Sequence, residues 1–263
     1  MGRLGFAGPG RREGYDAAFF TGSTLIVLSR LRQNLEDVRG RIARSRERGE
    51  HAASGVRLVV VTKTAPPAVF PLLRAAEVLD VGENRVLAAA ERRPGAPVGL
   101  TWHGIGHLQR NKAARAVDLF DVFHALDSRR LATRLEAVLA DADRRWPVYM
   151  QVNAAADPAK GGLAPEETMP FLKELAELPH LDCQGFMTMG RLEADEADSR
   201  AAFRLLREVR DDAVRLGVGE TAPEELSMGM TDDYEWAVEE GATIVRVGRA
   251  IFDGVFDAEE PRL

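Results

Sequence analysis

Lys63 is the residue of this chain whose type and position most directly suggest chemistry. It follows the apolar run Leu58-Val59-Val60-Val61-Thr62, which predicts a strand buried on both faces. A lysine at the tip of such a strand places an amine at the mouth of a hydrophobic core. There it loses hydration and becomes a nucleophile toward an aldehyde. Taken alone, Lys63 favours the alternative of a solvated lysine that only ends the strand, but the rest of the chain favours the nucleophile.

The elements that must position Lys63 alternate along the chain. Apolar runs predict strands at 58–62, 78–82, 99–105, 121–126, 147–152, 181–188, 223–228 and 243–248, with seven amphipathic helices between them. This alternation requires parallel strands with right-handed crossovers, and eight such units close into an α/β fold, the (β/α)8 TIM barrel. The alternative is a doubly wound open sheet, which more often carries a glycine-rich first turn that this chain lacks.

An additional N-terminal helix precedes the barrel. It is predicted from Ser23 or Thr24 to about Gly49, and its apolar face consists of Leu28, Leu31, Leu35, Val38 and Ile42. Residues 1–22 are rich in glycine and arginine without a clear period, and we expect a loose extension there, not a signal sequence. Residues 23–256 are expected to form a single domain.

Two glycine-containing turns are candidates for phosphate binding. Ser227-Met228-Gly229-Met230 follows the seventh predicted strand, and Gly248-Arg249-Ala250 follows the eighth. Loops at these two positions form the recurrent phosphate site of TIM barrels, which uses backbone N–H groups and a helix N-terminus. Glycine lets the backbone approach an anion closely, and Ser227 adds a hydroxyl donor. Two ordinary turns between a strand and a helix are the alternative.

Arg246 is a charged residue in an otherwise apolar strand. Alternation places it on the same face as Ile244 and Gly248. Because arginine stays protonated, an arginine that points into a barrel must meet an anion or a hydrogen-bond acceptor. If a pyridoxal ring lies between Lys63 and the phosphate loops, Arg246 faces the ring nitrogen, holds it unprotonated and weakens the ring as an electron sink. A structural salt bridge to a carboxylate is the alternative.

Composition limits the class of protein. The 263 residues carry a net charge of −6, from 35 basic and 41 acidic side chains, which indicates neither a nucleic-acid nor a membrane surface. The single cysteine, Cys183, excludes an intramolecular disulfide and a zinc–thiolate cluster, and we predict no metal site. No segment is long enough to span a bilayer. We expect a cytoplasmic protein, and the lack of a long exposed apolar stripe predicts a monomer.

Seven stretches between residues 59 and 252 carry a resemblance to a known family, which covers the chain from about residue 25 to 254. They are Val59-Val60-Val61-Thr62-Lys63, Gly82-Glu83-Asn84-Arg85, Trp102-His103-Gly104-Ile105-Gly106-His107-Leu108-Gln109-Arg110-Asn111-Lys112, Gln151-Val152-Asn153, Gly185-Phe186-Met187-Thr188-Met189, Leu226-Ser227-Met228-Gly229-Met230 and Val245-Arg246-Val247-Gly248-Arg249-Ala250-Ile251-Phe252. The third and sixth stretches are the most specific. On these residues the chain resembles the pyridoxal 5′-phosphate (PLP) homeostasis proteins, single-domain barrels of fold type III related to the N-terminal domain of alanine racemase.

The resemblance implies a cofactor and a set of residues that hold it. Lys63 would form the internal aldimine of PLP, and Ser227 with the Gly248-Arg249 backbone would contact its phosphate. Asn84 would lie near the ring and Arg246 near the ring nitrogen. The family implies a protein that binds PLP and helps to regulate its supply, without a firmly assigned catalytic reaction. Apo forms of PLP-dependent enzymes are the candidate partners.

Two residues depart from the family pattern. Gly104 stands where the family usually has a bulky residue, often Phe, so the packing under the rim is expected to differ. Arg249 stands where threonine is common, so a hydroxyl contact with phosphate is expected to be missing while the backbone contact persists.

Two enzymes are the alternatives to a carrier. A PLP-dependent amino-acid racemase needs a base on each face of the Cα carbon, and related racemases supply a tyrosine and a C-terminal β-domain. This chain ends soon after its eighth strand, and neither its three tyrosines (Tyr15, Tyr149 and Tyr234) nor His107 is an evident second base. A cofactor-free aldolase-like barrel would use Lys63 as a Schiff base to a sugar phosphate, but the lysine of such aldolases usually lies on a later strand. We therefore favour the carrier.

Overall fold

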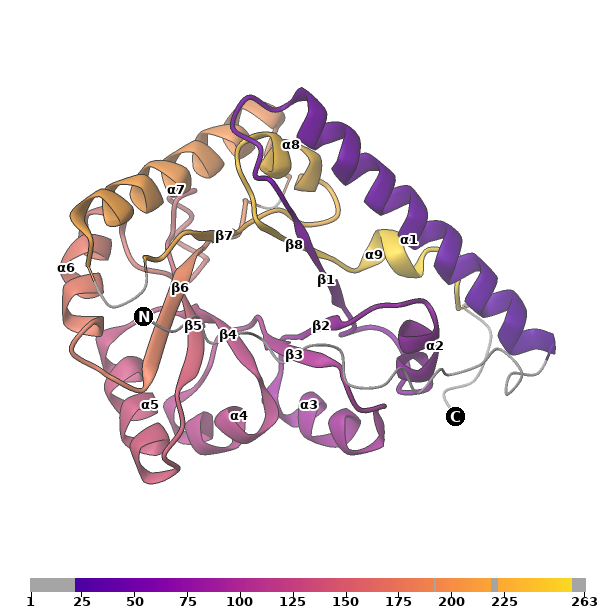
Figure 1. Ribbon diagram of the computed structural model, residues 1–263, viewed down its shortest axis with the longest axis horizontal. Helices are drawn as coiled ribbons and strands as arrows, with labels where there is room; N and C mark the ends of the chain where they lie inside the picture. Colours follow the sequence, from indigo (N-terminus) through magenta and orange to yellow (C-terminus); the bar gives the residue numbers. More distant parts are fainter. Residues whose placement is uncertain (1–21, 192, 219–221, 257–263) are drawn as a thin grey trace.

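A computed structural model of the chain describes residues 22–191, 193–218 and 222–256 (Figure 1). Its strands are β1 (Arg57–Val61), β2 (Asp80–Glu83), β3 (Thr101–Gly104), β4 (Val122–Leu126), β5 (Trp146–Gln151), β6 (Leu181–Met187), β7 (Glu225–Ser227) and β8 (Ile244–Val247). Its helices are α1 (Gly22–Arg48), α2 (Val69–Ala75), α3 (Val86–Arg92), α4 (Ala113–Leu119), α5 (Arg129–Asp141), α6 (Pro165–Leu175), α7 (Glu196–Leu216), α8 (Tyr234–Glu239) and α9 (Arg249–Phe252), with short 3-10 helices η2 (Arg93–Gly95) and η3 (Arg110–Lys112). Among the helices of the described residues, none is both long and apolar enough to cross a membrane.

The eight strands form one closed parallel barrel in chain order. β8 returns to β1, with Ile244 opposite Arg57 and Val247 opposite Val60. The predicted (β/α)8 barrel with an extra N-terminal helix is therefore confirmed. Closure brings the carboxyl ends of all strands to one rim, so the turns that follow β1, β7 and β8 share the face on which barrels of this kind carry their sites. Of the predicted extension, only Gly22 lies inside the described residues.

Aromatic side chains pack the layer between the barrel and its helices. The ring of Trp102 on β3 lies 5.0 Å from that of Phe70 on α2, and Trp146 on β5 stacks on Phe123 of β4 at 5.4 Å. Gly104 faces the same layer, because a Cβ atom at this position would lie 2.9 Å from the ring of Phe120. The Phe120 ring thus occupies the space that a side chain at position 104 would need.

Helix α1 runs along the outside of the barrel beside α8 and α9 (Figure 1). Its buried face includes every residue predicted for it: Leu28, Leu31, Leu35, Val38 and Ile42. From the same helix, Asn34 Nδ2 donates to the carbonyl oxygens of Ile251 at 3.0 Å and Asp253 at 2.9 Å. The first helix of the chain is therefore bound directly to the segment that follows β8.

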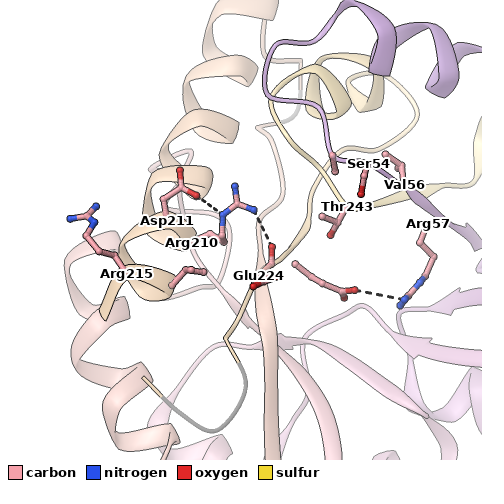
Figure 2. A pocket seen from close by; sticks show the side chains of 12 residues that line it. Ser54, Val56, Arg57, Arg210, Asp211, Arg215, Glu224 and Thr243 are labelled. Atoms are coloured by element: carbon pink, nitrogen blue, oxygen red, sulfur yellow. Dashed lines mark hydrogen bonds and ion pairs between the residues drawn. The ribbon is translucent and has the colours of Figure 1, made fainter. Parts of the chain in front are cut away.

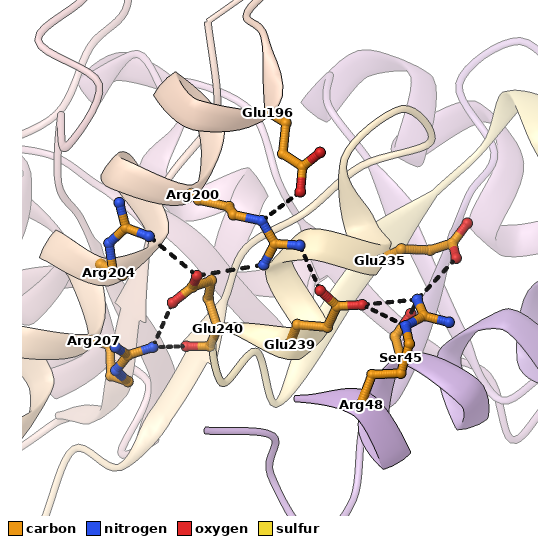
Figure 3. A network of polar contacts seen from close by, with 9 residues as sticks. All are labelled: Ser45, Arg48, Glu196, Arg200, Arg204, Arg207, Glu235, Glu239 and Glu240. Carbon is orange, nitrogen blue, oxygen red and sulfur yellow. Dashed lines mark hydrogen bonds and ion pairs between the residues drawn. The ribbon is translucent and has the colours of Figure 1, made fainter. Parts of the chain in front are cut away.

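A network of ion pairs joins α1 and α7 to α8 (Figure 3). Glu239 accepts from Arg48 of α1 at 2.7 Å and from Arg200 of α7 at 2.5 Å. Glu240, which is buried, contacts three arginines of α7: Arg200, Arg204 and Arg207. Because α8 directly precedes β8, this network holds in place the segment that leads into the strand carrying Arg246.

Candidate functional site

Lys63 lies at the rim, two residues beyond the end of β1. Thr62 is still buried and donates its backbone N–H to the carbonyl oxygen of Gly82 at 3.0 Å, which extends the pairing with β2. The next residue, Lys63, is exposed. The predicted position at the tip of the strand is confirmed, whereas the expected loss of hydration of the amine is not found in this structure, because burial ends at Thr62, one residue before the lysine.

The backbone around Lys63 is held by a buried ion pair. Glu83 at the end of β2 is fully buried, and its Oε2 accepts from Arg92 Nη1 at 2.7 Å. Arg92 also donates to the carbonyl oxygen of Thr62 at 2.9 Å and to that of Lys63 at 3.5 Å. The other carboxylate oxygen of Glu83 accepts the backbone N–H of Asn84 at 2.8 Å. One carboxylate thus ties together the turns that carry Lys63 and Asn84.

Asn84 itself is exposed at the rim. The loop after β3 is pressed against its backbone, since a Cβ atom at Gly106 would lie 2.3 Å from the Asn84 carbonyl oxygen. Only glycine fits at that point, which explains the Gly-His pair that follows β3. His107 is exposed as well, and its Nδ1 lies 2.9 Å from Asp127 Oδ2. A contact between Asn84 and a cofactor ring stays a prediction.

Arg246 is buried inside the barrel, as alternation along β8 predicts. Its Nη1 donates to Ser227 Oγ at 2.7 Å and its Nη2 to the carbonyl oxygen of Thr188 at 2.8 Å. Burial lowers the pKa of Arg246 to about 10, opposed by the nearby Asp233 carboxylate, so the guanidinium remains charged at neutral pH. The interior arginine therefore meets hydrogen-bond acceptors, one of the outcomes expected from the sequence.

The turn after β7 is compact and already internally bonded. Gly229 has a φ of +91°, and a Cβ atom there would lie 2.6 Å from Ala237 Cβ. The Met230 N–H donates to Asp233 Oδ1 at 2.6 Å, and burial raises the pKa of this carboxyl. Ser227 is fully buried with its hydroxyl in contact with Arg246 and His124, so its predicted contact with phosphate remains a prediction.

The turn after β8 approaches β1 closely. A Cβ atom at Gly248 would lie 3.0 Å from the Val61 carbonyl oxygen, so glycine allows the start of α9 to sit against the strand that leads to Lys63. Arg249, the first residue of α9, is exposed and forms an ion pair with Asp232 in the loop before α8. The two predicted phosphate turns are thereby linked to each other at the rim.

A line of polar side chains inside the barrel was not predicted. His124 on β4 joins Ser227 to His103 on β3: its Nδ1 lies 2.8 Å from Ser227 Oγ and its Nε2 lies 2.8 Å from His103 Nδ1. His103 Nε2 in turn lies 2.9 Å from Asp80 Oδ1 at the start of β2. Both histidines are fully buried. The available signal was a histidine inside each of two apolar strands, in Trp102-His103-Gly104 and Phe123-His124-Ala125.

A cavity of about 960 Å³ lies at the opposite end of the strands (Figure 2). The starts of β1, β7 and β8 and the last turns of α7 form its walls, where Arg57 pairs with Glu225 at 3.7 Å and Arg210 with Asp211 at 2.5 Å. No lysine lines it, and it lies away from Lys63 and Arg246. Cavity size therefore does not mark the predicted site. Within the described residues, no group of three or more His, Cys, Asp or Glu side chains is arranged to hold a metal ion.

Comparison with known proteins places this barrel in a family. The sequence model of the alanine racemase N-terminal domain matches residues 26–254. The pyridoxal phosphate homeostasis protein of Pseudomonas aeruginosa is 34% identical over 226 residues, which cover 86% of this chain and 96% of the relative. The pyridoxal phosphate homeostasis protein of Aquifex aeolicus is 34% identical over 221 residues, which cover 84% of this chain and 96% of the relative. This chain belongs to the pyridoxal phosphate homeostasis protein family.

Solved structures agree with this membership. PipY of Synechococcus elongatus PCC7942 with PLP bound has 31% identity and a TM-score of 0.71, covering 84% of this chain and 99% of PipY. The same protein without PLP gives a TM-score of 0.75 at 32% identity. An alanine racemase of Clostridium difficile has a TM-score of 0.68 at 14% identity and shares only the fold; the match covers 85% of this chain and 56% of the racemase.

Proposed function

We propose that this member of the pyridoxal phosphate homeostasis family binds PLP through Lys63 and acts as a carrier or regulator of PLP supply in the cytoplasm. The observation that carries the proposal is the register of β1 and β8. Val59 lies opposite Arg246, so an exposed amine, a buried guanidinium and the Gly248 turn come together at the seam between two neighbouring strands. PipY, a relative with 31% identity, has a structure with PLP bound.

The donors at this rim match the three reactive parts of PLP. A primary amine suits the aldehyde, a guanidinium suits the ring nitrogen, and backbone N–H groups at a glycine turn suit the phosphate. The start of α9 after β8 corresponds to the short extra helix that completes phosphate sites in such barrels. When bound, PLP supplies an aldehyde that condenses with a primary amine, releases water and can later be exchanged to another amine.

Each residue then has a defined task. Lys63 provides the amine, with its backbone held by the Glu83–Arg92 pair. Arg246 would donate at the ring nitrogen and keep that atom an acceptor, because the guanidinium does not give up its own proton near neutral pH. The backbone N–H groups of Gly248 and Arg249 would hold the phosphate, whereas the Ser227 hydroxyl, which already bonds Arg246 and His124, would support Arg246. Asn84 would lie beside the ring.

The geometry favours a carrier over a racemase. Tyr149 is buried in β5, where it donates to Glu225, and burial raises the pKa of its phenol. Tyr234 is buried at the start of α8, and burial raises the pKa of its phenol as well. Neither is available as a base at the rim, and Tyr15 lies outside the described residues. We propose that the protein acts as a monomer that hands PLP to apo forms of PLP-dependent enzymes.

The first experiment is the absorption spectrum of the purified protein with added PLP, followed by borohydride reduction and peptide mass mapping. The chain has only four lysines, Lys63, Lys112, Lys160 and Lys173, so the position of a reduced adduct is unambiguous. We expect the adduct on Lys63 in the wild-type protein. The Lys173→Ala control, which removes an exposed lysine of α6, should carry the adduct on Lys63 as well. Lys63→Ala should lose the adduct yet keep measurable PLP binding through the phosphate turns.

Two further outcomes separate the alternatives. No visible band and no adduct would discard PLP and favour the sugar-phosphate barrel. An adduct on Lys63 together with racemisation of free amino acids would make the protein an enzyme. Transfer of bound PLP to an apo-enzyme, at a rate above that of PLP release into buffer, would support the carrier.

A further inference from the structure

Five side chains form a hydrogen-bonded line across the inside of the barrel. It runs from the partly exposed Asp80 at the start of β2 through His103, His124 and Ser227 to Arg246 on β8. Each of the four contacts is between 2.7 and 2.9 Å. The line thus connects the amino-terminal end of the strands with the residue proposed to face the cofactor ring.

The chemistry of the end groups gives this line a direction. Arg246 can only donate, so Ser227 Oγ accepts from it, and the hydroxyl hydrogen is left for His124 Nδ1. His124 then carries its proton on Nε2 and donates to His103 Nδ1, and His103 donates through Nε2 to the Asp80 carboxylate. These tautomers follow from the network. In the reverse arrangement, His103 would carry its proton on Nδ1, and its unprotonated Nε2 would face the Asp80 carboxylate, so two acceptors would meet. His124 Nδ1–H and Arg246 would then both donate to Ser227 Oγ, and the hydroxyl hydrogen of Ser227 would compete with these two donors.

The surroundings of His124 support a neutral ring. Burial, and then the neighbouring His103, Arg246 and Arg57, lower the pKa of His124 well below its ordinary value of 6.5. The ring stacks on Tyr149 with 4.3 Å between centroids, and the Tyr149 hydroxyl donates to Glu225. The titratable and charged groups that face His124 are His103 on β3, Tyr149 on β5, Arg246 on β8 and Arg57 on β1.

We propose that Asp80, His103 and His124 are positioning residues that act on Arg246 through Ser227. The line fixes the orientation of the Ser227 hydroxyl, so one guanidinium N–H always has its acceptor inside the barrel and the guanidinium keeps one orientation. The inference rests on the proposed function, in which Arg246 donates at the ring nitrogen of PLP. It adds that a carboxylate at the far end of the barrel influences the electronic state of the cofactor.

The direction of the line can be tested without cofactor. Nitrogen-15 NMR of histidine-labelled protein distinguishes the two tautomers of each ring. We expect both His103 and His124 to carry their proton on Nε2, with His124 neutral throughout the pH range in which the protein stays folded. A proton on Nδ1 of His124, or a charged His124 at neutral pH, would overturn the proposal.

The influence on PLP is tested with Asp80→Asn and His124→Phe, the second of which keeps a ring over Tyr149. We expect Lys63 still to be trapped by borohydride, whereas the pH at which the visible band of the bound cofactor titrates should shift by about one pH unit. His180→Gln is the control, since His180 pairs with Glu136 at 2.7 Å outside the line. It should leave the titration unchanged.

The outcomes remain distinct. An unchanged titration in Asp80→Asn, with the Lys63 adduct intact, would contradict the inference while leaving the proposed function standing. Loss of the Lys63 adduct in the wild-type protein would instead refute the proposed function, and the NMR experiment would still decide the direction of the line. If His124→Phe does not fold, Asp80→Asn and the wild-type tautomers decide.

Discussion

Arg92 and Glu83 form a buried ion pair in which Nη1 lies 2.7 Å from Oε2, and the same Nη1 donates to the Thr62 carbonyl oxygen at 2.9 Å. One guanidinium group therefore joins the ends of β1 and β2 at the residue that precedes Lys63. Because the Lys63 side chain is exposed, its backbone is held in place by this contact of Arg92 with the Thr62 carbonyl oxygen.

Replacing Arg92 with lysine should disturb the Lys63 turn. A lysine ammonium cannot reproduce the planar fork that serves both a carboxylate and a carbonyl, so we expect slower borohydride-trappable attachment of PLP and a loss of about 1–3 kcal/mol of unfolding free energy. Arg93→Lys is the matched control, because the neighbouring Arg93 pairs with Asp121 at 2.9 Å on another loop. Equal attachment rates in both variants would show that the Arg92 contact does not order Lys63.

Gly229→Ala should weaken both the fold and PLP retention. A side chain at φ +91° is strained by about 1–3 kcal/mol, and its Cβ would also lie 2.9 Å from the Tyr234 Cα. Gly217 at the end of α7 provides a comparison with positive φ but open space, with no atom within 4 Å of the added Cβ. Gly217→Ala should cost only about 1 kcal/mol and leave PLP binding intact. Chemical denaturation and equilibrium dialysis measure the two effects.

Gly104→Phe should destabilise this protein. The new side chain would start 2.9 Å from the Phe120 ring, and overpacking of this kind costs about 1–3 kcal/mol. Combining it with Phe120→Ala should recover part of that loss, because the two positions share one space. The unfolding free energies in urea of the wild type, the two single variants and the double variant complete a double-mutant cycle. Purely additive changes would mean that the side chains at positions 104 and 120 do not compete for one space.

Glu240→Gln should reduce stability more than an exposed ion pair would suggest. Glu240 is buried and its carboxylate contacts Arg200, Arg204 and Arg207, the last at 2.8 Å (Figure 3). Glutamine keeps one accepting oxygen but removes the negative charge and replaces the second oxygen with an NH2 donor, so the expected loss is about 1–3 kcal/mol. Glu174→Gln, which breaks the exposed pair with Arg129, should change stability by less than about 0.5 kcal/mol.

The same network gives a pH dependence through Glu239. Burial alone would raise its pKa, but hydrogen bonds from Arg200 and Arg48 outweigh burial and lower it below its ordinary value of 4.5. A carboxyl whose pKa is lower in the folded state stabilises the protein above its unfolded pKa, and this contribution is lost as the pH falls through the folded pKa. The stability difference between wild type and Glu239→Gln should therefore be full at neutral pH and shrink below about pH 4.5. A constant difference down to pH 3 would contradict this.

The sequence predicted the barrel because its signals are local. Eight apolar runs of strand length alternate with seven amphipathic segments, and the face of α1 followed from helical spacing alone. Lys63 and Gly248 were expected at strand ends and are found there. The His103–His124 contact was not predictable in the same way, because it depends on the register between strands, which one sequence does not specify. The exposure of Lys63 depends on where the strand pairing stops.

The seam between β1 and β8 also joins distant parts of the chain. Asn34 of α1 holds the Ile251 and Asp253 carbonyls, and Val60 pairs with Val247. A ligand that spans Lys63 and the Gly248 turn would therefore stabilise the pairing of β1 with β8 and would bind only chains in which this pairing has formed. Because Gly248 leaves the ribosome long after Lys63, a nascent chain would not bind the cofactor in this way. The amount of bound PLP would then report the number of folded barrels and not the number of chains still being synthesised.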